Sequence, residues 1–228
     1  MKTILLLHGA LGSKEDLQPL LNSLQTSFTV YSINLYGHNG MGVEQEFSIE
    51  AFAQQVLDWM TENNLDKISI AGYSLGGYIA LYLAYTFPDK IEKIITLGTK
   101  LYWDKSIAEK EVGKLDPEVI EQKFPGYAAQ LILKHKAENW KKVLANTANL
   151  FIHIGQFNPL GFDKFNHITC PVLLMLGDSD KSVTLVETTM VYKELPGAQL
   201  AVLPHTKHAI SEVDIVLITY LITSFLNL

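Results

Sequence analysis

Ser74 is the residue of this sequence best placed to act as a nucleophile. It lies at the centre of Gly72–Gly76, a Gly-x-Ser-x-Gly motif that follows an apolar run, Ile68–Ala71, and precedes a helical pattern starting near Leu75. A serine on a sharp strand-to-helix turn exposes its hydroxyl, and the positive end of the helix dipole points at the same place. This arrangement predicts nucleophilic attack on an electrophilic carbonyl. The alternative is a serine that only caps the helix.

The glycines around this serine have a steric explanation. Side chains two residues before and two residues after it would collide across the turn, and the sequence has Gly72 and Gly76 there. Gly77 is expected to let the following helix approach the sheet closely.

The sequence offers two candidate acids and two candidate bases, all in loops after predicted strands. A serine hydroxyl is too weakly acidic to attack unaided, so it needs a base and an acid that orients the base. Asp180 is favoured because it lies further into its loop, whereas Asp178 can bond N–H groups of its own turn. His208 is favoured over His205 because it lies just before the final predicted helix and can reach back over the sheet.

The loop His8–Ser13, directly after the first predicted strand, is the expected source of an oxyanion donor. Negative charge on a substrate oxygen needs fixed donors, which are usually backbone N–H groups. We expect one from Leu75, after the serine, and one from Ala10. His8 could act as a base, but we favour a role in bracing this loop by hydrogen bonding.

Short apolar runs alternate with longer amphipathic ones. Runs rich in Ile, Val and Leu are typical of strands buried on both faces of a parallel sheet, and strand–helix alternation predicts an α/β fold. The expected strands are Ile4–Leu7, Thr29–Leu35, Ile68–Ala71, Ile91–Leu97, Val172–Leu176 and Leu200–Leu203. The expected helices around them are Leu17–Leu24, Ser48–Asn63, Leu75 to before Pro88, Ser182–Glu194 and Val213–Leu228.

The alternation breaks at residues 99–170, which contain helical patterns and no clear strand. We therefore expect a core of residues 1–98 and 171–228 with a helical lid, 99–170, inserted between them. The expected lid helices are Glu118–Phe124, Tyr127–His135 and Ala137–Ala148. The lid holds nine of the 23 aromatic residues, which mildly favours an apolar acyl group. The residues expected to contact substrate are Leu11, Tyr73, Trp103, Trp140 and Phe151.

Composition excludes several classes of protein. The formal net charge is −6 and all 18 basic residues are lysines, so nucleic-acid binding is not expected. The single cysteine, Cys170, excludes an internal disulfide and a Cys-rich zinc site. We expect no metal and no cofactor, because serine–histidine–aspartate chemistry needs neither.

Neither apolar end of the chain predicts a membrane segment. The run Ile4–Leu7 is shorter than a signal peptide requires, and Val213–Leu228 contains Asp214 and is shorter than the roughly 20 residues of a membrane span. We interpret Val213–Leu228 as a helix against the sheet, with a membrane or homodimer contact as alternatives. The expected location is the cytoplasm, with a small-molecule ester as the partner.

In combination, these residues resemble the α/β-hydrolase superfamily, and the stretch Ala71–Gly98 is similar to its small bacterial serine esterase-like members. The motifs, in the family's order, are His8-Gly9 with Gly12-Ser13, Gly72–Gly77, Gly177 with Asp180 and Val183, and His208. The resemblance implies about six mostly parallel strands in the spatial order second, first, third, fourth, fifth, sixth, with the family's first two strands missing. One departure is Asn34, where relatives often carry aspartate in Asp-x-x-Gly-x-Gly.

The resemblance implies hydrolysis of a carboxylic ester or thioester. Ser74 would attack, His208 would take and return the proton, Asp180 would hold the imidazole, and Ala10 and Leu75 would bind the oxyanion. Relatives that act as dehalogenases or epoxide hydrolases use aspartate instead of this serine. Perhydrolase or haloperoxidase-like chemistry, a lyase reaction and a non-catalytic binder of the same fold remain as alternatives.

The absence of arginine narrows the expected substrate. Several relatives hold a carboxylated substrate, or an acyl carrier protein, through arginines, and lysine replaces them only as a point charge. We therefore expect a neutral or weakly polar ester.

Overall fold

A computed structural model describes residues 2–228 and contains one six-stranded parallel sheet. The strands are β1 (Thr3–Leu7), β2 (Thr29–Ile33), β3 (Ile68–Tyr73), β4 (Ile91–Leu97), β5 (Val172–Gly177) and β6 (Gln199–Leu203). Their order is β2-β1-β3-β4-β5-β6, as the resemblance implied, and every neighbouring pair is parallel. Strand β2 is added on one side of β1, and β3 to β6 are added on the other side. The strand order therefore changes direction between β1 and β3, and ligands of open α/β sheets bind at such a switch point.

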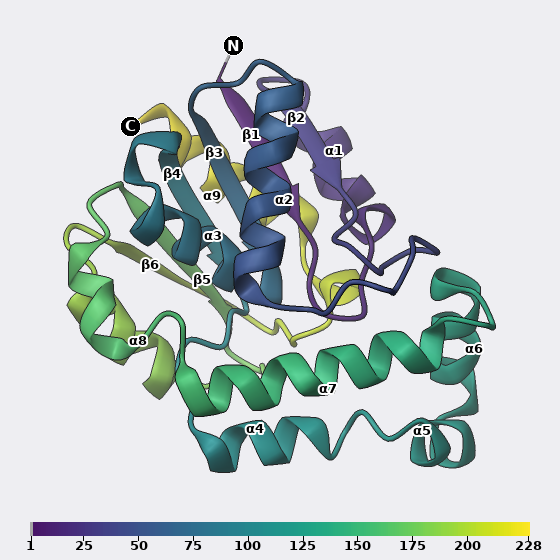
Figure 1. The fold of residues 1–228 in the computed structure, drawn as a ribbon. Coiled ribbons are helices and arrows are strands. Elements are labelled where there is room, and N and C mark those ends of the chain that lie inside the picture. The colour runs from purple at the N-terminus through teal and green to yellow at the C-terminus, as the bar shows by residue number, and fades with distance from the viewer. Residues whose placement is uncertain (1) are drawn as a thin grey trace.

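Helices cover both faces of the sheet (Figure 1). One face packs against α1 (Gln18–Leu24) and α9 (Ile215–Asn227), and the other packs against α2 (Ile49–Glu62), α3 (Leu75–Thr86) and α8 (Leu185–Glu194). The central strands are therefore buried on both sides, and Ile4–Leu7 have no exposed surface. This explains why these strands are continuous apolar runs.

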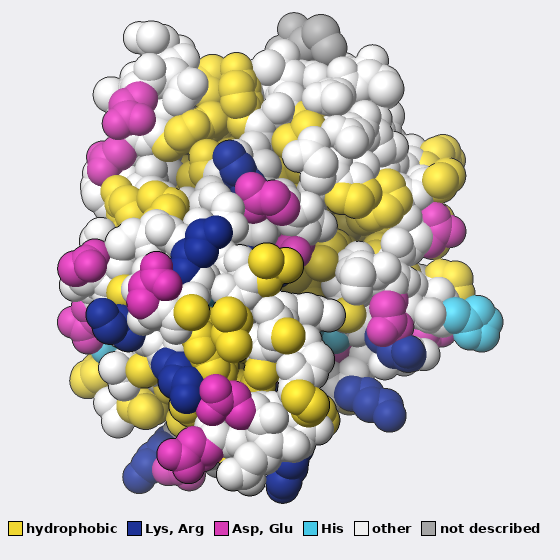
Figure 2. Space-filling view, turned by 90° about the vertical axis from the view of Figure 1, so that its right-hand side faces the viewer, with side chains coloured by type: hydrophobic (Ala, Val, Ile, Leu, Met, Phe, Trp, Pro, Cys, Tyr) yellow, Lys and Arg dark blue, Asp and Glu magenta, His cyan; other side chains and the backbone are white. Residues whose placement is uncertain are grey.

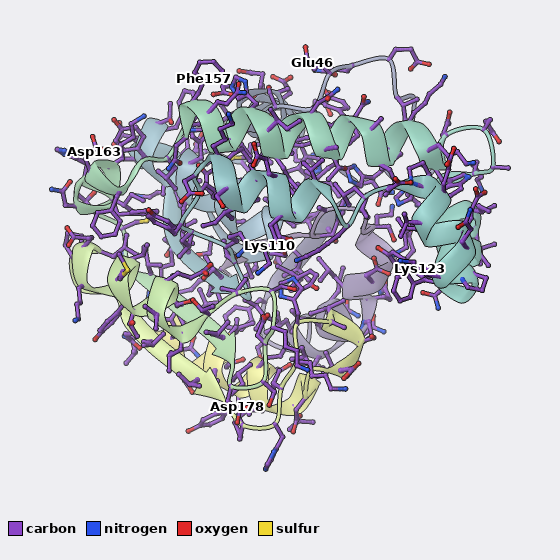
Figure 3. All side chains as sticks on the ribbon, turned by 90° about the horizontal axis from the view of Figure 1, so that it is seen from below. Glu46, Lys110, Lys123, Phe157, Asp163 and Asp178 are labelled. Atoms are coloured by element: carbon purple, nitrogen blue, oxygen red, sulfur yellow. The ribbon has the colours of Figure 1, made fainter. Side chains whose placement is uncertain are left out.

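Residues 99–170, which we call the helical segment, contain α4 (Lys105–Val112), α5 (Pro117–Lys123), α6 (Pro125–His135) and α7 (Trp140–Phe157). Figure 1 shows these helices together below the sheet. Helices α4 and α7 run antiparallel across the view from below in Figure 3. They pack so closely that a Cβ on Gly155 would lie 2.5 Å from Ala108 Cβ.

Several predicted helix boundaries need correction. Helix α7 runs from Trp140 to Phe157 rather than from Ala137 to Ala148. Helix α4 was not predicted, although Asp104 caps it by accepting a hydrogen bond from the Ile107 N–H. Helix α8 begins at Leu185 instead of Ser182, because the preceding residues are part of the turn around Asp180.

Helix α9 lies against the sheet as expected. Ile218 and Ile222 are buried, whereas Val216 and Tyr220 point away from the core with 79% and 67% of their surface exposed. Among residues 2–228, no helix has the length and apolar character needed to cross a membrane.

Candidate active site

Ser74 lies on the turn between β3 and α3 in a strained backbone conformation. Its φ is +50° and its ψ is −116°, in a region that residues other than glycine rarely adopt. Such strain costs on the order of 1–3 kcal/mol and persists only where the surroundings impose it. Here the Ser74 N–H donates to Leu97 O at 2.9 Å, and the Thr99 hydroxyl donates to Ser74 O at 3.0 Å.

Neither glycine that flanks Ser74 has room for a Cβ, but only Gly72 would collide across the turn as predicted. A Cβ on Gly76 would instead lie 2.3 Å from Leu7 O at the end of β1. A Cβ on Gly72 would lie 2.3 Å from the backbone N of Gly77 and the backbone C of Gly76. A Cβ on Gly77 would lie 2.0 Å from Thr99 Oγ1 and 3.1 Å from Thr96 Cβ, so this glycine allows α3 to approach the sheet, as predicted.

His208 and Asp180, the two residues favoured by the sequence, form a hydrogen-bonded pair. His208 Nδ1 lies 2.7 Å from Asp180 Oδ2, and the Asp180 side chain is 1% exposed. The other carboxylate oxygen, Oδ1, accepts hydrogen bonds from the N–H groups of Ser182 at 2.7 Å and Val183 at 2.9 Å. Burial acts to raise the pKa of Asp180, but the hydrogen bonds from His208 and from these backbone N–H groups outweigh it and lower that pKa.

The alternative residues play other roles. Asp178 accepts hydrogen bonds from the Thr206 N–H at 3.2 Å and from the Ser179 hydroxyl at 2.9 Å, so it bonds groups of its own turn and of the next loop. Its label in Figure 3 lies at the periphery, away from α4 and α7. His205 is exposed at the end of β6.

Ser74 and His208 line one cavity of about 680 Å³, between the carboxyl edge of the sheet and the helical segment. Ala10 and Leu75, the expected oxyanion donors, line it as well. Leu75 is the first residue of α3, and the first N–H groups of a helix have no acceptor within the helix. The arrangement brings a serine, a histidine–carboxylate pair and backbone donors to one solvent-accessible space.

Four of the five residues expected to contact substrate line this cavity: Leu11, Tyr73, Trp103 and Phe151. The prediction for Trp140 is wrong. Its side chain is 3% exposed in the hydrophobic core at the start of α7 and does not line the cavity. Tyr73 has an additional contact, because its hydroxyl donates to His208 O at 2.9 Å.

His8 braces the loop after β1, as expected. Leu35 N–H donates to His8 Nε2 at 3.0 Å, so the proton is on Nδ1, which donates to Gly9 O at 2.8 Å. The ring has no exposed surface, and burial lowers the pKa of His8 to about 4. A neutral ring held at both nitrogens is unsuited to act as a base.

A sequence profile described as the alpha/beta hydrolase fold matches residues 2–139. The chain belongs to the α/β-hydrolase fold family. The human serine hydrolase BPHL is 28% identical over 217 residues, which is 90% of this chain and 72% of that protein. A probable alcohol acetyltransferase of Wickerhamomyces anomalus is 34% identical over 96 residues, which is 41% of this chain and 28% of that protein. The chain thus matches less than a third of this yeast relative.

Solved structures of this fold cover the whole chain. The enol-lactonase of Burkholderia xenovorans LB400 superposes with a TM-score of 0.82 at 17% identity, covering 100% of this chain and 92% of that one. A thermophilic esterase of Thermogutta terrifontis superposes with a TM-score of 0.81 at 19% identity, covering 100% of this chain and 90% of that one. These likenesses establish that the α/β-hydrolase fold extends beyond residue 139.

The cavity of this α/β-hydrolase-fold chain also has charged walls that the sequence did not predict. Five lining residues carry charge: Asp16, Lys100, Glu111, Lys114 and Lys134. They come from three separate parts of the chain, around residues 16, 100–114 and 134, and no motif marks them. Among residues 2–228, no group of three or more His, Cys, Asp or Glu side chains is arranged to hold a metal ion.

Every lysine that lines the cavity is paired with a carboxylate. The Nζ–carboxylate distances are 2.5 Å for Lys134–Asp16, 2.7 Å for Lys114–Glu111 and 4.0 Å for Lys100–Glu111. Lys100 also lies 3.6 Å from Glu187 Oε1. On the face shown in Figure 2, lysine and acidic side chains likewise lie next to each other in the lower half.

Proposed function

We propose that this protein hydrolyses a small carboxylic ester or thioester through an acyl-enzyme on Ser74. The observation that carries the proposal is the pairing of His208 Nδ1 with a buried Asp180 carboxylate, because His208 lines the same cavity as Ser74. The strained conformation of Ser74 and the neighbouring helix N-terminus are the features expected of an exposed nucleophile. The human serine hydrolase among its relatives supports the same class of reaction.

The reaction would proceed in two acyl-transfer steps. His208 takes the Ser74 proton as the hydroxyl attacks the substrate carbonyl, and it returns that proton to the leaving alcohol or thiol. Water, deprotonated by His208, then attacks the acyl-enzyme and releases the acid and free Ser74. In both steps the N–H groups of Ala10 and Leu75 hold the oxyanion, and Asp180 keeps the imidazole in the required tautomer.

A fluorophosphonate probe tests the proposal directly. We expect stoichiometric labelling of Ser74, located by mass spectrometry of the digested protein, because a serine activated by a base attacks phosphorus as it attacks carbonyl carbon. His208→Ala should suppress labelling, whereas His205→Ala should leave it unchanged. Absence of labelling in a folded wild-type protein would favour a non-catalytic binder of the same fold.

We further propose that residues 99–170 act as a lid and that the substrate is neutral. Trp103 and Phe151 of this segment line the cavity and offer it apolar surface. Because the lining lysines are already paired with carboxylates, a carboxylate on the substrate would have to break an ion pair or remain unpaired. The chain has no arginine to hold such a group by two parallel hydrogen bonds.

Two esters of equal acyl length, one neutral and one with a terminal carboxylate, test whether the cavity prefers a neutral substrate. We expect kcat/KM for p-nitrophenyl valerate to exceed that for mono-p-nitrophenyl glutarate by roughly tenfold or more, since burying a group without its hydrogen-bonding partner costs about 1–3 kcal/mol. Glu111→Gln should narrow the difference, because it removes the carboxylate shared by Lys100 and Lys114. A wild-type preference for the glutarate ester would contradict the neutral-substrate proposal.

A further inference from the structure

The end of α6 and the residue after it connect the helical segment to the two loops that follow β1 and β2. Three consecutive residues make the connection. Lys134 Nζ lies 2.5 Å from Asp16 Oδ2, and His135 hydrogen bonds to both loops. The Lys136 side chain lies against Gly40, where an added Cβ would be 3.2 Å from Lys136 Cγ and Cε. The end of α6 is therefore fixed to the sheet side of the cavity.

His135 is the buried member of this connection, and its two ring nitrogens have fixed roles. Asn39 N–H donates to His135 Nδ1 at 3.1 Å, so Nε2 carries the proton and donates to Leu11 O at 3.0 Å. The side chain has no exposed surface. Burial lowers the pKa of His135, so the neutral ring that these two hydrogen bonds require is the stable form.

The residue that His135 holds lies in a turn against the nucleophile. In the turn Gly9–Gly12 the Gly12 N–H donates to Gly9 O at 3.1 Å, and a Cβ on Gly9 would lie 3.1 Å from Ser74 Cβ. Leu11, the third residue of this turn, has a φ of +58°. A positive φ at this position is the pattern of a type II turn, which favours glycine or asparagine there.

A leucine in that conformation needs an external restraint, because the strain would otherwise be relieved by rotation of the peptide. Two histidine rings supply hydrogen bonds to the turn. His8 donates to Gly9 O at 2.8 Å, before Ala10, and His135 donates to Leu11 O, after it. The peptide group that carries the Ala10 N–H is therefore held at its own carbonyl, Gly9 O, by His8, and the turn two residues further on is held by His135.

We propose that His135 is a positioning residue that holds the Gly9–Gly12 turn, and with it the Ala10 N–H, in place beside Ser74. The inference rests on the proposed function for its catalytic consequence, since the fixed N–H serves there as an oxyanion donor. His135 belongs to the helical segment and does not line the cavity, so its task in the reaction would be exerted through the turn. The structural part, restraint of the turn, holds whatever reaction the cavity supports.

Substituting His135 by glutamine or by asparagine tests its two hydrogen bonds, to Leu11 O and from Asn39 N–H, one at a time. In His135→Gln the side-chain amide can place an N–H near the Nε2 position and donate to Leu11 O, whereas in His135→Asn it can accept only from Asn39 N–H. We expect His135→Asn and His135→Ala to lower kcat by roughly 10- to 100-fold with little change in KM, since an ångström-scale misplacement of a catalytic group costs up to about 10²-fold. His135→Gln should retain most of the activity.

A trifluoromethyl ketone adds a readout that general loss of stability would not give. This inhibitor forms a tetrahedral adduct with an active-site serine, so its affinity depends on the oxyanion donors. We expect its Ki to rise in His135→Asn by the same factor by which kcat/KM falls, while Kd for the alcohol product, which carries no oxyanion, is unchanged. His153→Ala replaces an exposed histidine of α7 and is the matched control, expected to resemble wild type.

Hydrogen exchange of the backbone amides separates failure of this inference from failure of the proposed function. In His135→Asn the amides of residues 9–12 should exchange faster than in wild type, whether or not the protein is an esterase. If wild type labels at Ser74 and turns over esters but His135→Asn matches it in kcat, Ki and exchange, the inference is overturned. If wild type neither labels nor turns over, the proposed function fails, and unchanged exchange at residues 9–12 would then overturn the restraint as well.

Discussion

Replacing Ser74 by alanine is expected to lower kcat for ester hydrolysis by about 10⁶-fold, the magnitude typical for loss of a serine nucleophile. The residual rate would come from the donors and the cavity, which remain in place. Alanine has the same Cβ as serine, so the backbone conformation at φ +50° and its interactions with Leu97 and Thr99 should survive. Steady-state kinetics with p-nitrophenyl butyrate, at enzyme concentrations high enough to detect slow turnover, would measure the effect.

Ser74→Gly separates the chemistry from the backbone strain. Glycine adopts a positive φ without steric cost, so this variant should lose the same activity but show a higher Tm than Ser74→Ala. Ser106→Ala, on the exposed surface of α4, is the matched serine control and should keep wild-type kcat. Full esterase activity in Ser74→Ala would show that another group is the nucleophile.

The features of the site that were predictable from the sequence are those that depend on short motifs and on the family's fold. Gly72 was interpretable because its Cβ would collide with the backbone of Gly76 and Gly77 in the same turn, and Asp180 because it lies deeper in its loop than Asp178. The order of the strands followed from the family resemblance rather than from any residue. The contact that explains Gly72 lies within the motif, whereas the strand order and the Asp180–His208 pairing are shared by the fold.

Contacts between distant segments were not predictable in the same way. His135 meets Leu11 across 124 residues, and nothing in the pattern of α6 distinguishes this histidine from a solvated one. Trp140 illustrates the opposite error, since an aromatic residue in a segment over the sheet can equally well face the cavity or the core. The Lys134–Asp16 pair of the cavity wall depends on how α6 packs against the loop after β1, which the helical patterns alone do not specify.

Asp180→Asn is expected to lower kcat by about 10⁴-fold, the effect associated with a wrong histidine tautomer. The hydrogen bonds of Asp180 determine this outcome. The N–H groups of Ser182 and Val183 both donate to Oδ1, so the oxygen of an asparagine must take that position. Its NH₂ group then faces His208 Nδ1, which must accept a hydrogen bond instead of donating one. The imidazole proton is thereby moved to Nε2, and the ring can no longer take a proton from Ser74.

Asp178→Asn is the matched control, because it removes the same charge from the same loop. Asp178 accepts from the Thr206 N–H and the Ser179 hydroxyl, and the oxygen of an asparagine can keep accepting from that N–H, so kcat should stay within a few-fold of wild type. A larger loss of kcat in Asp178→Asn than in Asp180→Asn would reverse the assignment of the acid. Unchanged Tm in Asp180→Asn, together with the loss of kcat, would place the effect on the tautomer of His208 rather than on folding.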